Sequence, residues 1–333
     1  MTTGTMAIPL KMLVCIVAAA CCLYGFESKS DDADKAAPPA GDPMLGKKAG
    51  EVRDDNGLKM KFVWCPRGSV AMNTVAVRKE PGGDIEDISD DPPNEKPRPP
   101  RVTVHRILVK AFVADCWIGK CEVTRSEWKQ VMGSEPWSVQ AFGQEGDDYP
   151  VTHVSWDDAV AFCTKLTWQE RTAGRLPEGW EITLPTEAQW EHACRARSRT
   201  DFYFGDDASK LPEHAWYVEN TRGTAEPFAH RVGQKKPNAW GLYDMHGNVS
   251  EWCKDDYMQT IRGGVNPEVT TADSERVVRG GSWNDNPTAC RCSDRFGNST
   301  SRGSVNLGFR AAICAVRPAE PGEGRGGSAN FDK

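Results

Sequence analysis

The C-terminal part of the chain carries three short motifs rich in glycine and aromatic residues, and these constrain the fold more than any other feature. They read PNAWGLYDMHGNVSEW at 237–252, RGGSW at 279–283 and NLGFR at 306–310. Beyond Asp201 no apolar pattern of helical period is long enough to predict a further helix. Irregular backbone must still pair its polar groups, so such a region needs aromatic anchors together with bound cations or disulfides. We therefore expect this part to be held together by loops.

Regular elements are predicted earlier in the chain. Residues 60–70 and 101–119 alternate apolar and polar positions and contain many β-branched residues, which predicts strands that pair into a sheet. Three helices are predicted from their first residues, because each begins with a capping residue followed by apolar positions at helical spacing. The capping residues are Thr124, Ser155 and Thr186.

Taken together, the three motifs resemble those of the formylglycine-generating enzyme and sulfatase-modifying-factor family, from about Asn56 to Val316. The resemblance implies an α+β fold of the complex C-type-lectin-like kind, in one domain, with few helices, short strands and much irregular structure. It also implies an activity, the oxidation of a cysteine in a sulfatase segment of the type C-x-P-x-R to formylglycine. A sulfatase, or another protein with such a segment, is then the expected partner.

The N-terminal 26 residues predict export. Lys11 precedes an apolar run at 12–24 that is too short to span a bilayer comfortably, as in a secretory signal. Three alanines before Cys21 are also compatible with a lipoprotein cleavage site, so the alternatives are plain cleavage or a lipid anchor on that cysteine. The mature protein is expected to be periplasmic, secreted or lipid-anchored, with membrane contact only through such an anchor.

The remaining boundaries follow from composition. Residues 27–55 and 318–333 have few large apolar side chains and predict a disordered tether and tail around a domain at 56–317. Residues 80–101 run from acidic to proline-rich and basic, which predicts a long surface loop that is either solvated or used for docking. The formal net charge is −6 and there is no basic stripe, so nucleic-acid binding is not expected.

The segment DMHGNVSEW resembles the calcium-binding loop of the family, in which carboxylate and main-chain oxygens surround a hard cation. The matching positions are Asp244, Gly247, Val249 and Glu251. Glu251 is the favoured side-chain ligand, whereas the glycine and valine would offer only carbonyl oxygens. The alternative is a tight turn with solvated carboxylates. A second calcium site is implied by the segment AWYVENT, through Asn220 and Thr221.

Nine of the twelve cysteines follow the leader, and in an exported protein some should be bridged. The resemblance implies one bridge between Cys194 and Cys292. A second family bridge would join Cys163 to the position after GFR, which is Ala311 here with Cys314 three residues further along, so the alternative for Cys163 is burial as a small apolar residue. A local pair of Cys116 with Cys121 is a further alternative.

The resemblance also implies a copper centre, because the formylglycine generators bind Cu(I) through two thiolates shortly after RGGS. Counting forward from that motif places Asp285 at the first position and Cys290 at the second, whereas counting backward from Cys292 and Arg295 matches Cys290 to neither position. The pair is incomplete on either alignment.

The role of Cys290 is left open by the sequence. It is a residual active-site thiol, one half of a soft-metal chelate with Cys292, or a structural cysteine. Ser282 matches an active-site serine of the family, or simply forms a hydrogen bond in a turn. Two functions follow: a copper-dependent oxidase centred on Cys290, or a non-catalytic, calcium-stabilised binding or structural module. The carboxylate at Asp285 favours the second.

Overall fold

The computed structural model describes residues 41–79, 102–137, 146–261, 263–271 and 274–316, which all fall in one compact unit at 36–333. The expected leader, surface loop and tail lie outside these residues, as does the tether up to residue 40, and they stay predictions. No helix in the described ranges is both long enough and apolar enough to cross a membrane.

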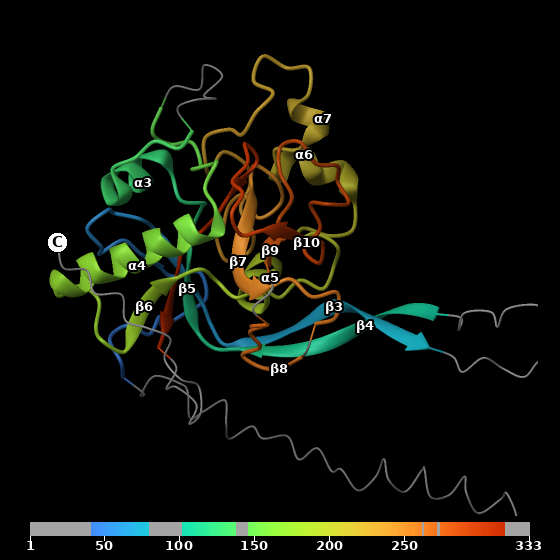
Figure 1. Cartoon of the computed structure of the whole chain (residues 1–333), viewed down its shortest axis with the longest axis horizontal. Helices are drawn as coiled ribbons and strands as arrows, with labels where there is room; N and C mark the ends of the chain where they lie inside the picture. The colour runs from blue at the N-terminus through green and yellow to red at the C-terminus, as the bar shows by residue number, and fades with distance from the viewer. Residues whose placement is uncertain (1–40, 80–101, 138–145, 262, 272–273, 317–333) are drawn as a thin grey trace, which may run out of the picture. The chain divides into compact units, whose positions relative to one another are not determined.

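The fold is α+β, as predicted, with strands in three sheets (Figure 1). The largest has the order β1-β2-β5-β12-β6, and its neighbouring strands are antiparallel. Its strands are β1 (Val52–Arg53), β2 (Phe62–Cys65), β5 (Cys116–Gly119), β12 (Ala312–Ala315) and β6 (Trp180–Thr183). The strand that follows NLGFR is therefore an inner strand, between β5 and β6, of a sheet built mostly from the N-terminal half.

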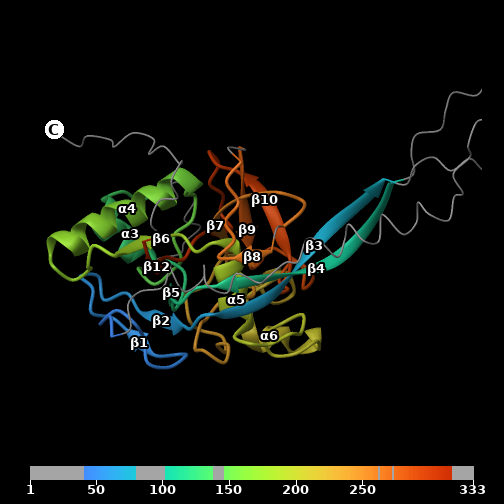
Figure 2. The same cartoon turned by 90° about the horizontal axis from the view of Figure 1, so that it is seen from below.

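A second sheet has the order β10-β9-β7-β11 and contains the strands around the three motifs. Its members are β10 (Arg295–Ser299), β9 (Glu275–Arg279), β7 (Ser250–Asp256) and β11 (Leu307–Gly308). The third sheet pairs two long strands, β3 (Gly68–Lys79) and β4 (Val102–Val113), and adds the short β8 (Gly264–Val265). In Figures 1 and 2 the β3–β4 ribbon extends beyond the other described elements.

The three predicted helices are confirmed, and each begins with the expected capping box. They are α3 (Arg125–Met132), α4 (Trp156–Thr172) and α5 (Glu187–Arg195). The short α6 (Leu211–His214) and α7 (Val218–Thr221), and a 3₁₀ turn at Ala208–Lys210, were not predicted, because four residues are too few to show a helical period.

Helix α5 is the structural centre of the described residues. Eight of its nine residues are buried, and it contacts β3, β4, β7 and β9. Its acidic residues are paired inside the protein: Glu187 lies 2.6 Å from Arg295, and Glu191 forms an ion pair with the fully buried Arg279. The RGGSW motif is thus anchored to this helix by its own arginine.

The domain begins earlier than the sequence predicted. The indole N–H of Trp180 donates to Asp42 at 3.0 Å, and that of Trp117 donates to the carbonyl of Met44 at 2.7 Å. Met44 is itself 3% exposed and belongs to the main hydrophobic core. Residues 42–55 are therefore part of the folded domain, because one buried methionine and two indole hydrogen bonds offset the polar composition of the segment.

Candidate functional site

The loop that ends the first motif is shaped by residues with positive φ. Asp244, Gly247 and Asn248 have φ values of 57°, 103° and 60°. A Cβ atom at Gly247 would lie 2.2 Å from the carbonyl oxygen of Trp216, so only glycine fits there. This backbone buries Asp244, Val249 and Glu251 almost completely.

Glu251 is held by three nitrogen donors. Its two oxygens accept hydrogen bonds from the Nε and Nη2 of Arg310, each at 2.6 Å, and one of them also accepts from the indole of Trp190 at 2.7 Å. Arg310 also donates to the carbonyls of Gly119 and Tyr243, at 2.9 and 3.0 Å. Both charged side chains are fully buried. The favoured calcium ligand of the sequence analysis is thus engaged in a bidentate ion pair that links the first and third motifs.

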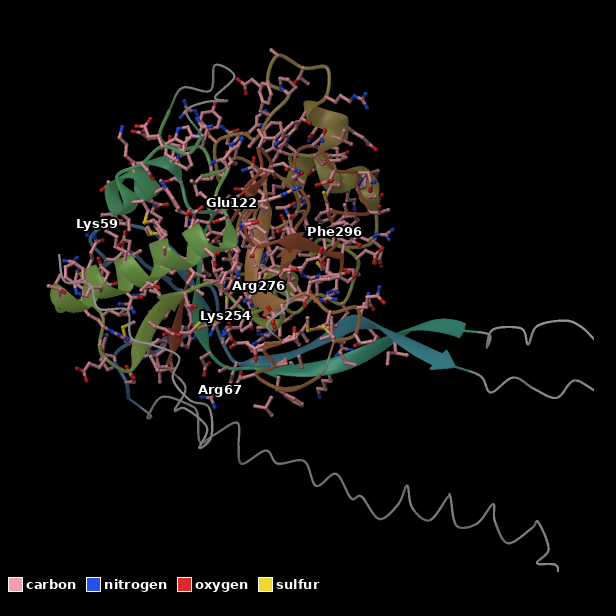
Figure 3. All side chains as sticks on the ribbon, viewed as in Figure 1. Lys59, Arg67, Glu122, Lys254, Arg276 and Phe296 are labelled. Atoms are coloured by element: carbon pink, nitrogen blue, oxygen red, sulfur yellow. The ribbon has the colours of Figure 1, made fainter. Side chains whose placement is uncertain are left out.

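Unpaired carboxylate oxygens lie instead on Asp244 and on Glu122, which is labelled in Figure 3 and follows β5. One oxygen of Glu122 accepts from the Asn248 amide at 3.0 Å, and one oxygen of Asp244 accepts from the Gly233 N–H at 2.6 Å. The second oxygen of each group is buried without a hydrogen-bond donor among the described residues. Burying two carboxylate oxygens without partners in one interior site is energetically costly, and a positive charge between them would offset that cost.

The pKa shifts of Glu122 and Asp244 also indicate a site that favours a proton or a cation. Burial raises the pKa of Glu122 well above its usual range, and the charges of Asp244 and Glu251 raise it further. Burial also raises the pKa of Asp244, against the opposing effects of the Gly233 N–H and Arg310. Asp244 and Glu122 are close enough to share a hydrogen bond. A proton between them, or a hard cation with oxygen ligands, would relieve the repulsion. The residues therefore fit a cation, with Glu122 as a carboxylate that the sequence analysis missed.

No sequence signal marked Glu122, because it lies far from the loop in sequence. Only the fold brings Glu122 next to Asp244.

Asn220 and Thr221, expected at a second calcium site, have local partners. The Asn220 amide bonds to Tyr217 and Ala215, and the Thr221 hydroxyl donates to the carbonyls of Tyr217 and Trp283. These hydrogen bonds hold the short helix α7 to its neighbouring residues. A cation bound by Asn220 and Thr221 would have to compete with them.

The RGGSW turn brings together the residues expected at the oxidising centre. Ser282 donates to Asp285 at 2.5 Å and accepts from the Asn306 amide at 3.1 Å. A Cβ atom on Gly281 would lie 2.9 Å from the sulfur of Cys290, so the thiol packs against the turn. Burial raises the pKa of Cys290, and the charge of Asp285 adds to the effect. One protonated thiol beside a carboxylate does not fit Cu(I), which requires soft thiolate ligands.

The expected bridge partners, Cys194 and Cys292, lie side by side. Their sulfur atoms are 3.5 Å apart, and both are thiols in the structure. Burial raises the pKa of Cys292, but the hydrogen bond from Cys194 and the neighbouring His246 outweigh it and lower the pKa well below its usual range. His246 completes a buried group of three soft-metal ligand types. Its Nδ1 bonds to the carbonyl of Cys290 and its Nε2 accepts from the Tyr203 N–H, so both ring nitrogens already have partners.

A cleft of about 930 Å³ lies between the start of β3 and the end of α5. Its lining includes Arg67, Arg195, Arg197 and Arg199, but not Ser282, Cys290 or Asp244. The cleft and the buried carboxylates are therefore separate features of the molecule.

A scan against family models matches residues 49–315 to the sulfatase-modifying factor enzyme 1-like domain. The chain belongs to the sulfatase-modifying-factor family. The match covers the described residues from just before β1 to the end of β12, so the likeness found in the three motifs extends over the whole domain.

Curated relatives include active and inactive members. The chain is 32% identical over 217 residues to the formylglycine-generating enzyme of Mus musculus, covering 57% of this chain and 55% of the enzyme. It is 34% identical over 213 residues to the inactive C-alpha-formylglycine-generating enzyme 2 of Bos taurus, covering 60% of each chain. It thus spans little more than half the length of these relatives. Among solved structures, PvdO from Pseudomonas aeruginosa has the same fold, with a TM-score of 0.61 at 24% identity over 80% of this chain and 99% of that one.

Proposed function

We propose that this protein is an exported, non-oxidising member of the family, a binding module stabilised by a calcium ion between Glu122 and Asp244. The observation that carries the proposal is Asp285, hydrogen-bonded to Ser282, at the position that the resemblance assigns to the first copper thiolate. A relative whose name describes it as inactive is as similar to the chain as the active enzymes are, which makes loss of the oxidising centre compatible with the scaffold.

The calcium part rests on the two buried carboxylates. Oxygen ligands and buried negative charge suit Ca²⁺, and the carbonyls of Gly247 and Val249 belong to the same loop. Glu251 would act indirectly, since its bidentate contact with Arg310 fixes the strand that follows the loop. The calcium ion would supply the positive charge that this interior site lacks.

Calcium titration with a thermal readout tests this part. The melting temperature of the purified protein should rise with calcium and fall with a chelator, because a ligand that binds only the folded state stabilises it. Glu122→Gln should abolish this response, since it removes the charge but keeps an oxygen for the Asn248 amide. Glu213→Gln, on an exposed ion pair with Lys236, is the control and should respond like the wild type. A melting temperature indifferent to chelator in the wild type would refute the calcium site.

The family also supports a partner of the sulfatase type, which we propose is bound without being oxidised. A fluorescent C-x-P-x-R peptide should bind to the calcium-loaded protein in an anisotropy assay, and a peptide with the motif scrambled should not. Equal binding of both peptides, or of neither, would count against this partner.

A second function, oxidation centred on Cys290, has one observation in its favour: Ser282, Asp285 and Cys290 converge at the RGGSW turn. Conversion of the peptide thiol to an aldehyde, lost in Cys290→Ser, would establish this oxidase function.

We further propose that Cys194 and Cys292 are bridged in the exported protein, because their sulfur atoms are only 3.5 Å apart. Cell fractionation tests the export itself.

A further inference from the structure

Three cysteines stand in a row across the largest sheet. Cys65 on β2 is directly opposite Cys116 on β5, which is directly opposite Cys314 on β12. Residues opposite one another on neighbouring strands project to the same face of a sheet, so the three thiols share a face. All three pack in or against the same core cluster.

The pairing between β5 and β12 brings two of these side chains especially close. The N–H of Gly119 donates to the carbonyl of Ala311 at 2.8 Å, which marks these opposed residues as a hydrogen-bonded pair. Hydrogen-bonded and non-hydrogen-bonded pairs alternate along an antiparallel ladder. Cys116 and Cys314 lie three steps along the register and therefore form a non-hydrogen-bonded pair, the kind in which side chains approach most closely.

The pairing between β2 and β5 has the opposite phase. The N–H of Lys120 donates to the carbonyl of Lys61 at 2.8 Å, so this opposed pair is hydrogen-bonded. Four steps along, Cys116 and Cys65 are also a hydrogen-bonded pair, in which the strands stand farther apart. Cys116 is thus closer to Cys314 than to Cys65.

The contacts of the thiols agree with this phase. A side-chain hydrogen bond joins Cys116 to Cys314, and with burial it raises the pKa of Cys116 well above its usual range. The thiol of Cys65 instead donates to the carbonyl of Val63 at 3.7 Å. Cys314 is partly exposed whereas Cys116 is 2% exposed, so a reagent reaches the pair from the β12 side.

We propose that Cys116 and Cys314 form a cross-strand disulfide, made by exchange with a disulfide oxidant, which rests on the export of the protein proposed above. The Cys314 thiol loses its proton and attacks the oxidant, forming a mixed disulfide and releasing one oxidant thiol. Cys116 then loses its proton and displaces the second oxidant thiol, which leaves the Cys116–Cys314 bond. Two protein thiols are oxidised, and one oxidant disulfide is reduced to two thiols. The structure, in which both residues are free thiols, describes the reduced form.

The bond would clamp together the two segments that place Arg310 and Glu122 at the buried site. Arg310 lies just before β12 and donates to the carbonyl of Gly119 at the end of β5. Glu122 follows β5 within a few residues. A bridge between these strands encloses about 200 residues of chain, a long loop for which a disulfide restricts the unfolded state strongly.

Peptide mapping tests the bond directly on the full chain, purified without reductant and alkylated before digestion. Trypsin places the relevant cysteines in four different peptides: Cys65 in 62–67, Cys116 in 111–120, Cys121 in 121–125 and Cys314 in 311–325. The expected result is a linked species of 111–120 with 311–325 that separates on reduction. Alkylated Cys116 and Cys314, or Cys116 linked to 62–67 or 121–125, would overturn the proposal.

A pair of matched variants adds a thermal readout. Cys65→Ser should keep the linked peptides and a reductant-induced fall in melting temperature like that of the wild type. Cys314→Ser, at a partly exposed position, should lose the linked species and show a smaller fall, by on the order of 10 °C. Equal falls in the two variants would contradict a stabilising Cys116–Cys314 bond. Neither measurement depends on the proposed calcium site or on loss of oxidase activity.

Discussion

Glu251→Gln should destabilise the protein far more than its nearly identical shape suggests. Glu251 and Arg310 are both fully buried, and two hydrogen bonds of 2.6 Å join them. Burial lowers the pKa of Arg310, but Glu251 outweighs this and raises it above its ordinary value, so the guanidinium stays charged. The amide would offer only one acceptor oxygen, and its NH₂ group would face an N–H of Arg310.

The expected cost is that of leaving a buried charge without its partner, about 3–5 kcal/mol. For a domain of this size, each kcal/mol corresponds to roughly 2–4 °C in melting temperature, so we expect a fall of about 6–20 °C. The carbonyls of Gly119 and Tyr243 still accept from Arg310, which keeps the cost from being larger.

Urea unfolding followed by tryptophan fluorescence measures this cost, because Trp190 and Trp252 are fully buried beside the site. Glu213→Gln is the matched control, since its partner Lys236 is 63% exposed and solvent screens that pair. The control should leave the unfolding midpoint unchanged. A Glu251→Gln midpoint equal to that of the control would refute the view that this ion pair organises the site.

Two further predictions concern the loop and the pH dependence. Gly247→Ala should lower the free energy of unfolding by at least about 1 kcal/mol more than Gly241→Ala, since both glycines have positive φ but only the first would overlap the carbonyl of Trp216; equal losses would contradict the overlap. Burial lowers the pKa of His192 from its usual 6.5, so this residue contributes stability above pH 6.5 that is lost as the pH falls below it. His192→Gln, which can still donate to the carbonyl of Pro66, should show a smaller drop in melting temperature between about pH 7 and about pH 5; an unchanged drop would exclude this contribution.

Features set by neighbouring residues could be predicted from the sequence. The capping boxes at Thr124, Ser155 and Thr186 need only residues three apart, and all three helices begin where expected. The loop motifs also identified the family, because glycine and aromatic spacing reflects backbone shape, as the 2.2 Å approach at Gly247 illustrates.

Features set by long-range pairing could not be predicted in the same way. The ion pair of Glu251 with Arg310 and the approach of Glu122 to Asp244 each join residues far apart in sequence. No residue near Glu251 indicates that its oxygens are taken by an arginine from the third motif. The row of cysteines likewise depends on strand register, since a shift of one residue would move a thiol to the other face of the sheet.

We propose above that the scaffold is kept and that the oxidising centre is lost at Asp285. Mass spectrometry of a C-x-P-x-R peptide, incubated in air with the Cu(I)-treated protein and beside an active formylglycine-generating enzyme, tests it most directly. We expect the peptide to keep its thiol with this protein, whereas the active enzyme converts the thiol to an aldehyde. Conversion to the aldehyde by this protein, lost in Cys290→Ser, would contradict the claim.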